Sequence, residues 1–163
     1  MNSFAAALDV LNQMKAGGVV RDYAVAGAMA LVFWTEPIPT YDLDVLVWLP
    51  EAPGPIISLA PVYAWALERG YAAEAEHIVV AGVPVQLLPA QDPLADEAIA
   101  TAMTLDYAGV PVRVVRPEYL IALYLEPSAR TRRRQERAAL LAESPAVERD
   151  RLTDLLARYN LEW

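Results

Sequence analysis

The pair of acids Asp42 and Asp44 places the strongest constraint on what this chain can fold into. They stand directly before the hydrophobic run Val45-Leu46-Val47, and the composition around them predicts a strand over 41–49 that ends at Pro50. Side chains alternate between the faces of a strand, so both acids are expected to point the same way. Two carboxylates on one face repel each other unless a cation lies between them, and Mg²⁺ prefers oxygen ligands. The simpler alternative is a strand whose solvent face carries two acids.

The composition is that of a globular protein. Of 163 residues, 56% are hydrophobic and 21% are charged, which excludes a disordered chain and allows one domain with a real core. The net charge of −8 argues against general binding of duplex DNA, because proteins that coat duplex nucleic acid usually carry the opposite sign.

The residue types that are scarce exclude several kinds of site. The chain has no cysteine, which excludes disulfides, zinc–thiolate sites and thiol nucleophiles, and its single histidine, His77, excludes a multi-histidine metal site. The longest uncharged hydrophobic run, 23–35, is too short to cross a membrane, which needs about 20 residues. The N-terminus lacks the pattern of a secretory signal, so we expect a cytoplasmic protein that binds no membrane.

The order of predicted elements indicates the fold class. We expect helices at 3–15, 28–34, 56–69, 94–103, 117–125, 129–143 and 147–159, strands at 22–26, 41–49, 77–81, 83–88 and 110–115, and a Pro/Gly linker at 51–55. Strands and helices alternate early and helices dominate late, which favours an α/β (α+β) fold with a small mixed sheet flanked by helices. We expect a single domain over 1–163, made of an α/β core over 1–115 and a helical C-terminal cap over 116–163.

Gly27 and Ala28 mark the expected turn from the first strand into a short helix. A glycine at such a turn lets backbone N–H groups approach a phosphate, and the N-terminus of the helix adds a partial positive charge. Plain turn geometry or close packing of helix on sheet explains a single glycine equally well.

Basic residues crowd into the helix predicted over 129–143, at Arg130, Arg132, Arg133, Arg134 and Arg137. One interpretation is a solvated helix face, paired with nearby glutamates. The other is that one or two of these guanidiniums, with Arg130 and Arg133 as the candidates, reach the two aspartates and hold a triphosphate or an RNA backbone.

The order of these motifs resembles the signature of the nucleotidyltransferase superfamily with the polymerase-beta-like fold. The resemblance is carried by Gly27-Ala28-x-Ala30, a short helix, and Thr40-x-Asp42-x-Asp44 followed by a hydrophobic strand. A strand pair that ends at 84–89 and a helix that opens at 116–122 follow in a similar order. Within the superfamily the chain is most similar to minimal members and to the AbiEii-type proteins of bacterial toxin–antitoxin systems.

This resemblance implies transfer of a nucleoside monophosphate from an NTP to a hydroxyl on RNA, on a protein or on a small molecule. Gly27, Ala28 and Thr40 would lie at the nucleotide, and Asp42 and Asp44 would hold Mg²⁺, with Mn²⁺ as the other option. A third acid would complete the catalytic set on a later strand, near Gln86. An antitoxin or another paired subunit would be the protein partner.

Gln86 is an amide where the resemblance implies an acid. An amide oxygen can ligate a metal, but it carries no charge and is a poor base for a hydroxyl. The alternative function is therefore a catalytically degenerate protein of the same fold that serves as a binding or regulatory subunit. The chain also has Ala28 where the family usually has Ser or Gly, and Ile38 where a basic residue often stands. A third alternative is an α/β domain with an acidic surface and no metal.

Overall fold

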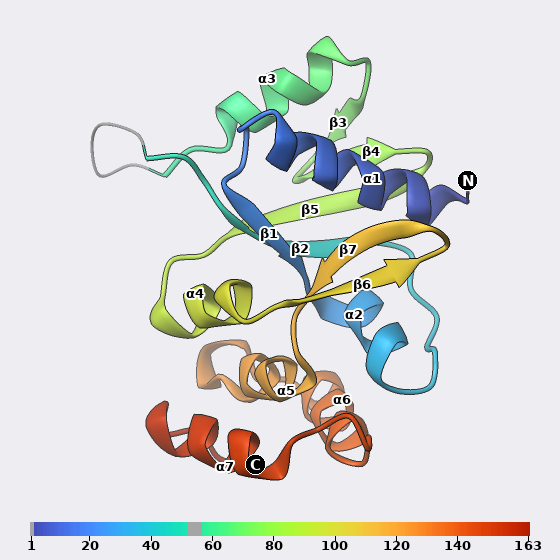
Figure 1. The fold of residues 1–163 in the computed structure, drawn as a ribbon. Helices are drawn as coiled ribbons and strands as arrows, with labels where there is room; N and C mark the ends of the chain where they lie inside the picture. The colour runs from blue at the N-terminus through green and yellow to red at the C-terminus, as the bar shows by residue number, and fades with distance from the viewer. Residues whose placement is uncertain (1, 52–56) are drawn as a thin grey trace.

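The computed structural model describes residues 2–51 and 57–163 and contains a seven-stranded mixed sheet with helices on both faces (Figure 1). The strand order is β3-β4-β5-β2-β1-β7-β6. The central strands are β1 (Asp22–Val25), β2 (Leu43–Trp48), β5 (Val83–Pro89) and β7 (Val110–Val114). β2 runs parallel to β5 and antiparallel to β1, and β1 runs parallel to β7. The outer strands β3 (Ala72–Glu74), β4 (His77–Val80) and β6 (Met103–Tyr107) all pair antiparallel with their neighbours. The predicted fold class is confirmed.

Helix α1 (Ser3–Ala16) covers one face of this sheet (Figure 1). Its buried residues recur at helical spacing, and Leu8, Leu11 and Met14 are each at most 1% exposed. Asn2 caps its first turn, because the Asn2 side-chain oxygen accepts a hydrogen bond of 2.8 Å from the backbone N–H of Ala5. Helix α3 (Ala60–Glu68) lies outside this layer, beside β3 at the edge of the sheet.

The remaining helices lie on the opposite face and at one end of the molecule (Figure 1). α2 (Gly27–Trp34) and α4 (Pro93–Ala100) contact the sheet directly, and α5 (Pro117–Leu125) packs against both. α6 (Arg132–Ala142) and α7 (Arg149–Arg158) pack on α5, which is almost entirely buried between them and the core. The C-terminal segment is helical, as predicted. No helix in the described part of the chain is long and apolar enough to cross a membrane.

Two strands lie where the sequence predicted none, and both are at edges of the sheet. The helix predicted over 94–103 ends at Ala100, and β6 follows as one arm of a hairpin with β7. Half-buried and exposed residues alternate along β6, which is the pattern of an edge strand. β3 has the sequence Ala-Ala-Glu and is exposed throughout, so only its pairing with β4 makes it a strand.

Several boundaries differ from prediction because of local hydrogen bonds and prolines. The helix predicted over 56–69 is observed at Ala60–Glu68, with a proline in its first turn; residue 56 and most of the linker predicted over 51–55 lie outside the described residues. The helix predicted over 129–143 begins only at Arg132, after a 3₁₀ turn at Pro127–Ala129. The Thr131 hydroxyl caps it by accepting a hydrogen bond from the backbone N–H of Arg134 at 3.2 Å. Arg130 therefore precedes α6.

Candidate functional site

The sheet aligns three polar residues of β2, β5 and β4 in one row. Asp44 of β2 pairs in register with Gln86 of β5, and Gln86 pairs with His77 of β4. Residues in register on neighbouring strands present their side chains on the same face. Leu43 and Val45, on either side of Asp44, are fully buried on the other face, whereas Asp44, Gln86 and His77 are half-buried. Asp42 precedes the strand, which starts at Leu43 and not at residue 41 as predicted, and Asp42 is exposed.

Gly27 lies directly against the carboxylate of Asp44. A Cβ atom at this position would sit 2.5 Å from Asp44 Oδ2 and 3.0 Å from Asp44 Cβ, so a side chain at position 27 would collide with the acid. The backbone there has φ of 57°, a conformation that favours glycine. The N–H of Ala26 donates a hydrogen bond of 2.8 Å to the Asp44 carbonyl, which fixes this turn to β2. The glycine is thus required by close approach to an acid as well as by the turn.

A cavity of about 680 Å³ opens beside the two acids. One wall comes from the start of α2 and from the loop before β2, and consists of Ala28, Ile38, Pro39, Thr40, Tyr41, Asp42 and Asp44. The Thr40 hydroxyl donates to the Asp42 backbone carbonyl at 3.1 Å and so holds the bend of this loop. The opposite wall is one face of α6, formed by Arg133, Glu136, Arg137 and Leu140. Three acids, Asp42, Asp44 and Glu136, and two arginines therefore line the cavity.

The arginines of the basic segment are distributed differently from the prediction. Arg133 lines the cavity, but Arg130 does not: its guanidinium donates to the backbone carbonyl of Glu162 near the C-terminus. Arg137 lines the cavity and was not singled out from the sequence. Arg133 and Arg137 are four residues apart and so share one face of a helix. Once the helix is known to begin at Arg132, this spacing indicates that Arg133 and Arg137 face the same cavity.

The carboxylate of Asp44 is half-buried and has no partner among the described residues. Burial raises its pKa, and the neighbouring charge of Asp42 raises it further, while the charges of His77, Arg134 and Arg137 act in the opposite direction. Among the described residues, none donates a hydrogen bond to this carboxylate and none forms an ion pair with it within 4.0 Å. The arginines influence Asp44 from across the cavity without closing on it.

Two more polar atoms without partners lie in the same region. The Tyr124 hydroxyl and Arg134 Nε are buried and make no hydrogen bond with a described residue. The Arg134 guanidinium lies 5.0 Å from the centre of the Tyr124 ring and donates to the Leu123 carbonyl at 3.2 Å. Burial raises the pKa of Tyr124, and the charges of Arg137, Arg134 and Asp44 also act on its hydroxyl. Hydrogen-bond donors from α5 and α6 therefore gather near Asp44 with no acceptor.

Asp42 and Asp44 are the residues that could hold a hard divalent cation. Both offer carboxylate oxygens to the same cavity, and neither the turn at Gly27 nor the helix α6 supplies a competing donor to Asp44. In the described part of the chain, no group of three His, Asp or Glu side chains converges closely enough to hold a metal by itself. The remaining ligands would be substrate oxygens and water, which is the usual case for Mg²⁺.

Gln86 contacts a carboxylate that the sequence did not indicate. Its side-chain Nε2 donates a hydrogen bond of 3.1 Å to Oε2 of Glu76, a residue of the turn between β3 and β4. A second hollow of about 470 Å³ lies beside this turn, lined by Tyr41, Asp42, Glu74, Ala75, His77 and Pro84. Tyr41 and Asp42 belong to both hollows. Glu76 escaped prediction because β3, which sets the position of the turn, carries no strand signal.

Solved structures share this architecture at low sequence identity. An antigenic nucleotidyltransferase-like protein from Paracoccidioides brasiliensis matches with a TM-score of 0.61 and 17% identity, over 96% of this chain and 87% of that one. The chain has the nucleotidyltransferase-like fold. ANT(2")-Ia in complex with adenylyl-2"-tobramycin matches with a TM-score of 0.57 and 16% identity, over 98% of both chains. A solution structure of ANT(2")-Ia matches with a TM-score of 0.53 and 17% identity, over 98% of this chain and 93% of that one. No protein-family model and no curated protein matches the sequence.

Proposed function

We propose that this protein is a Mg²⁺-dependent nucleotidyltransferase that moves a nucleoside monophosphate from an NTP to a hydroxyl acceptor. The observation that carries the proposal is the state of Asp44. It is a half-buried carboxylate with no partner among the described residues, beside a second acid and opposite the arginines of α6. An unpaired charge out of full contact with water is costly, so it is retained where a ligand supplies the partner.

Asp42 and Asp44 would hold the metal, with Mn²⁺ as the alternative to Mg²⁺. Such a metal neutralises the charge of a triphosphate and stabilises the charge that develops as the phosphoryl bond breaks. The N-terminus of α2 would receive a phosphate, because its N-cap residue Ala26 provides no side-chain cap for the N–H groups of the first turn. Ala28 and Thr40 lie beside this turn in the wall of the cavity.

The arginines of α6 would hold the polyphosphate part of the nucleotide. Arg133 and Arg137 line the cavity, and guanidinium groups bind phosphate oxygens through charge-assisted hydrogen bonds. The Tyr124 hydroxyl and Arg134 Nε, which lack acceptors, lie close to Arg137 and Asp44. Among the described residues, these donors have no acceptor and the Asp44 carboxylate has no cation beside it, and a bound metal–phosphate group would supply both. Arg130, held at the carbonyl of Glu162, has no part in this proposal.

The second hollow would receive the acceptor. It meets the first at Tyr41 and Asp42, so a hydroxyl placed there approaches the metal from the side opposite to the arginines. Its lining includes the acids Asp42 and Glu74 and no Lys or Arg. That charge favours a neutral or cationic acceptor, such as a small polyol or amine, over RNA. Transfer would proceed by in-line displacement at the α-phosphorus, with positioning and charge neutralisation as the main sources of rate.

Isothermal calorimetry of ATP binding in the presence of Mg²⁺ tests the site. We expect the wild type to bind MgATP and the double variant Asp42→Asn/Asp44→Asn to lose at least about tenfold in affinity, since a charged hydrogen-bonding or ionic contact is worth about 1.5–3 kcal/mol. Asp106→Asn, an exposed acid on the β6 strand, is the matched control and should bind normally. Equal affinity in the wild type and the double variant would refute the site.

Gln86 supports a second candidate function, a catalytically degenerate protein of this fold that binds nucleotide or a partner without turnover. The likeness to AbiEii-type proteins stays a prediction based on motif residues, as does a paired antitoxin. Retained MgATP binding together with absent release of pyrophosphate would favour this second function. Co-purification of one stoichiometric partner with the full chain would support a paired subunit.

A further inference from the structure

A carboxylate lies next to Gln86, the position that lacks an acid in the sequence. Gln86 lies next to Asp44 across the parallel pair β2–β5, at the place where the resemblance implies a third acid. Its side-chain amide donates to Glu76 Oε2 at 3.1 Å. The carboxylate of Glu76 is thus hydrogen-bonded to Gln86, which lies on β5, the strand next to that of Asp44. Neighbouring strands are about 4.8 Å apart, so Glu76 reaches the edge of the site through Gln86.

The turn that carries Glu76 is held in place by contacts outside the site. The Tyr63 hydroxyl of α3 donates to the backbone carbonyl of Glu76 at 3.1 Å. The preceding residue, Ala75, has φ of 52°, which tightens the reversal between β3 and β4. The pairs Glu74 with His77 and His77 with Gln86 then align the hairpin with β5. The backbone of Glu76 is therefore held in place by these contacts, and its carboxylate accepts a hydrogen bond from Gln86.

Glu76 lies beside the second hollow, although its side chain is not part of the lining of either hollow. No three His, Asp or Glu side chains of the described residues come together as a metal site, so Glu76 does not join Asp42 and Asp44 around one ion. Its neighbours Ala75 and His77 both line the second hollow, in which the acceptor hydroxyl would lie. Glu76 is exposed, so a bound acceptor can reach it.

We propose that Glu76 is the general base of this site and that Gln86 is the residue that positions it. This inference rests on the proposed function. The acceptor O–H would give its proton to the Glu76 carboxylate as its oxygen bonds to the α-phosphorus. The bond from the α-phosphorus to the bridging oxygen would break, and pyrophosphate would leave with the electron pair. The carboxylate that is missing at position 86 is supplied by the adjacent hairpin.

The test compares Glu76→Gln with Glu68→Gln. Glu68 is an exposed acid at the end of α3 that lines neither hollow, and only Glu76 receives the hydrogen bond of Gln86. Pyrophosphate release from MgATP is measured with water and with glycerol as acceptors, and MgATP affinity is measured by calorimetry. We expect Glu76→Gln to lower kcat by about 10²–10⁴-fold, the usual contribution of a general base, with MgATP affinity unchanged. Glu68→Gln should change kcat by less than about threefold.

Moving the carboxylate provides the sharper half of the experiment. The double variant Glu76→Gln/Gln86→Glu keeps one acid and one amide but exchanges their places, and we expect it to recover at least about tenfold in kcat over Glu76→Gln alone. A merely structural role for Glu76 would give no such recovery. The inference is overturned if Glu76→Gln and Glu68→Gln lose the same activity, or if the exchange restores none.

The outcomes also separate this inference from the proposed function. If the wild type binds MgATP through Asp42 and Asp44 but releases no pyrophosphate with either acceptor, the role of Glu76 as a base is wrong and the nucleotide site stands. If MgATP does not bind, or binds without dependence on the two aspartates, the proposed function fails and the inference falls with it.

Discussion

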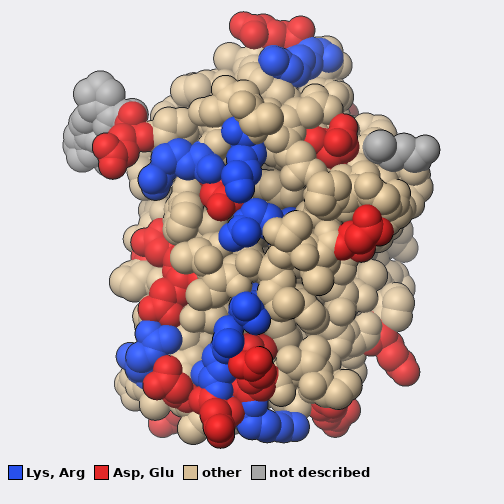
Figure 2. Space-filling model, in the orientation of Figure 1, with Lys and Arg blue, Asp and Glu red and all other residues tan. Residues whose placement is uncertain are grey.

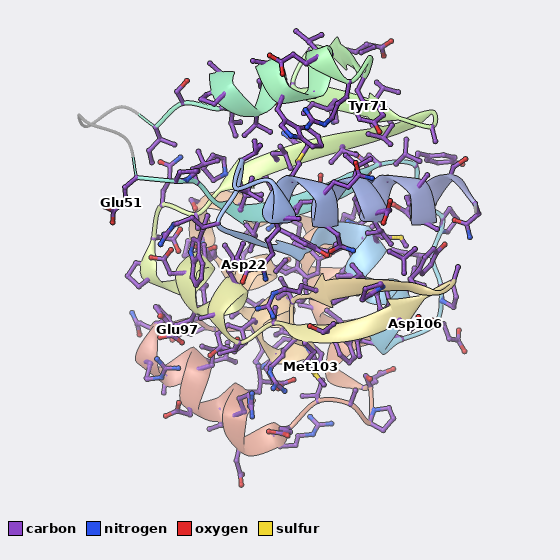
Figure 3. All side chains as sticks on the ribbon, turned by 45° about the horizontal axis from the view of Figure 1, so that its top comes forward. Asp22, Glu51, Tyr71, Glu97, Met103 and Asp106 are labelled. Atoms are coloured by element: carbon purple, nitrogen blue, oxygen red, sulfur yellow. The ribbon has the colours of Figure 1, made fainter. Side chains whose placement is uncertain are left out.

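Two carboxylates of this molecule have opposite surroundings. Glu97 of α4 accepts hydrogen bonds from Arg158 at 2.8 and 3.0 Å, from the Tyr159 hydroxyl at 2.7 Å and from the Tyr119 hydroxyl at 3.1 Å. These donors, Arg158 foremost, lower the pKa of Glu97 to about 2. Figure 3 shows Glu97 where α4 meets the C-terminal helix, and acidic and basic side chains alternate over that part of the surface (Figure 2). Glu97 thus joins α7 to the core.

Asp44 has none of these partners, and its pKa is raised by burial and by Asp42. Arg133 and Arg137 of α6 line the same cavity as Asp44 but form no ion pair with it. The hydrogen-bond donors around an acid therefore distinguish a structural role from a binding role. An acid that accepts hydrogen bonds from several residues of the fold stabilises the fold, whereas an acid that lies at a cavity without such donors is available to bind a ligand.

Among the variants that test this comparison, the largest effect is expected from filling the space at Gly27. In Gly27→Ala the new Cβ would meet Asp44 Oδ2 at 2.5 Å and displace the carboxylate, and displacements of this order cost about 10²-fold in rate. The unfolding free energy should also fall by about 1–3 kcal/mol because of the backbone conformation. Gly109→Ala, in the hairpin turn between β6 and β7, is the control: φ is 86° and nothing lies within 4 Å of its Cβ. It should destabilise the protein and leave pyrophosphate release unchanged; equal loss of activity in both would contradict the account.

An intermediate effect is expected from the α6 arginines. Arg137→Met should weaken MgATP binding by about tenfold, in line with the loss of one charge-assisted contact. Arg130→Met removes the same charge from a guanidinium held at the Glu162 carbonyl, and should leave the affinity within about twofold. Calorimetry on the two variants at one ionic strength measures this difference. A greater loss of MgATP affinity in Arg130→Met than in Arg137→Met would show that Arg130, as predicted from the sequence, contacts the phosphate.

The smallest effect is expected at Glu97 and concerns stability alone. Glu97→Gln should lower the unfolding free energy at pH 7 by about 1 kcal/mol, because solvent reaches a third of this side chain and screens the ion pair. The pKa of Glu97 is lowered from 4.5 to about 2 in the folded protein, so its contribution is complete above pH 4.5 and is lost as the pH falls toward 2. Denaturant unfolding of both proteins across this range measures the difference, and a constant difference at all pH values would contradict the prediction.

The part of the site that lies close together in the chain could be predicted from the sequence. Gly27, Ala28, Thr40 and the two aspartates come from one short stretch, and all five lie at or beside the first cavity. The alternation of Val and Leu after Asp44 also predicted the strand that carries the site. Local patterns of this kind depend on few residues and are read directly.

The parts contributed from a distance could not be read in this way. Arg137 and Tyr124 come near Asp44 only because α5 packs against α2 and α4 and carries α6 to the cavity. Glu76 meets Gln86 only because an exposed Ala-Ala-Glu segment pairs with β4. From the sequence, Arg130 and Arg133 were equal candidates for the phosphate contact. In the structure the N-cap at Thr131 starts α6 at Arg132, so Arg130 lies outside the helix. Each depends on tertiary packing that carries no local signal.

The most direct test of the central claim is the melting temperature of Asp44→Asn and of Glu97→Gln, each measured without ligand and with saturating MgATP. We expect Asp44→Asn to be as stable as the wild type or about 2–4 °C more stable without ligand, since an unpartnered charge is removed. We also expect it to lose the rise in melting temperature that MgATP causes. Glu97→Gln should melt lower and keep the full rise. The account is contradicted if Asp44→Asn melts lower than the wild type and still gains the full stabilisation from MgATP.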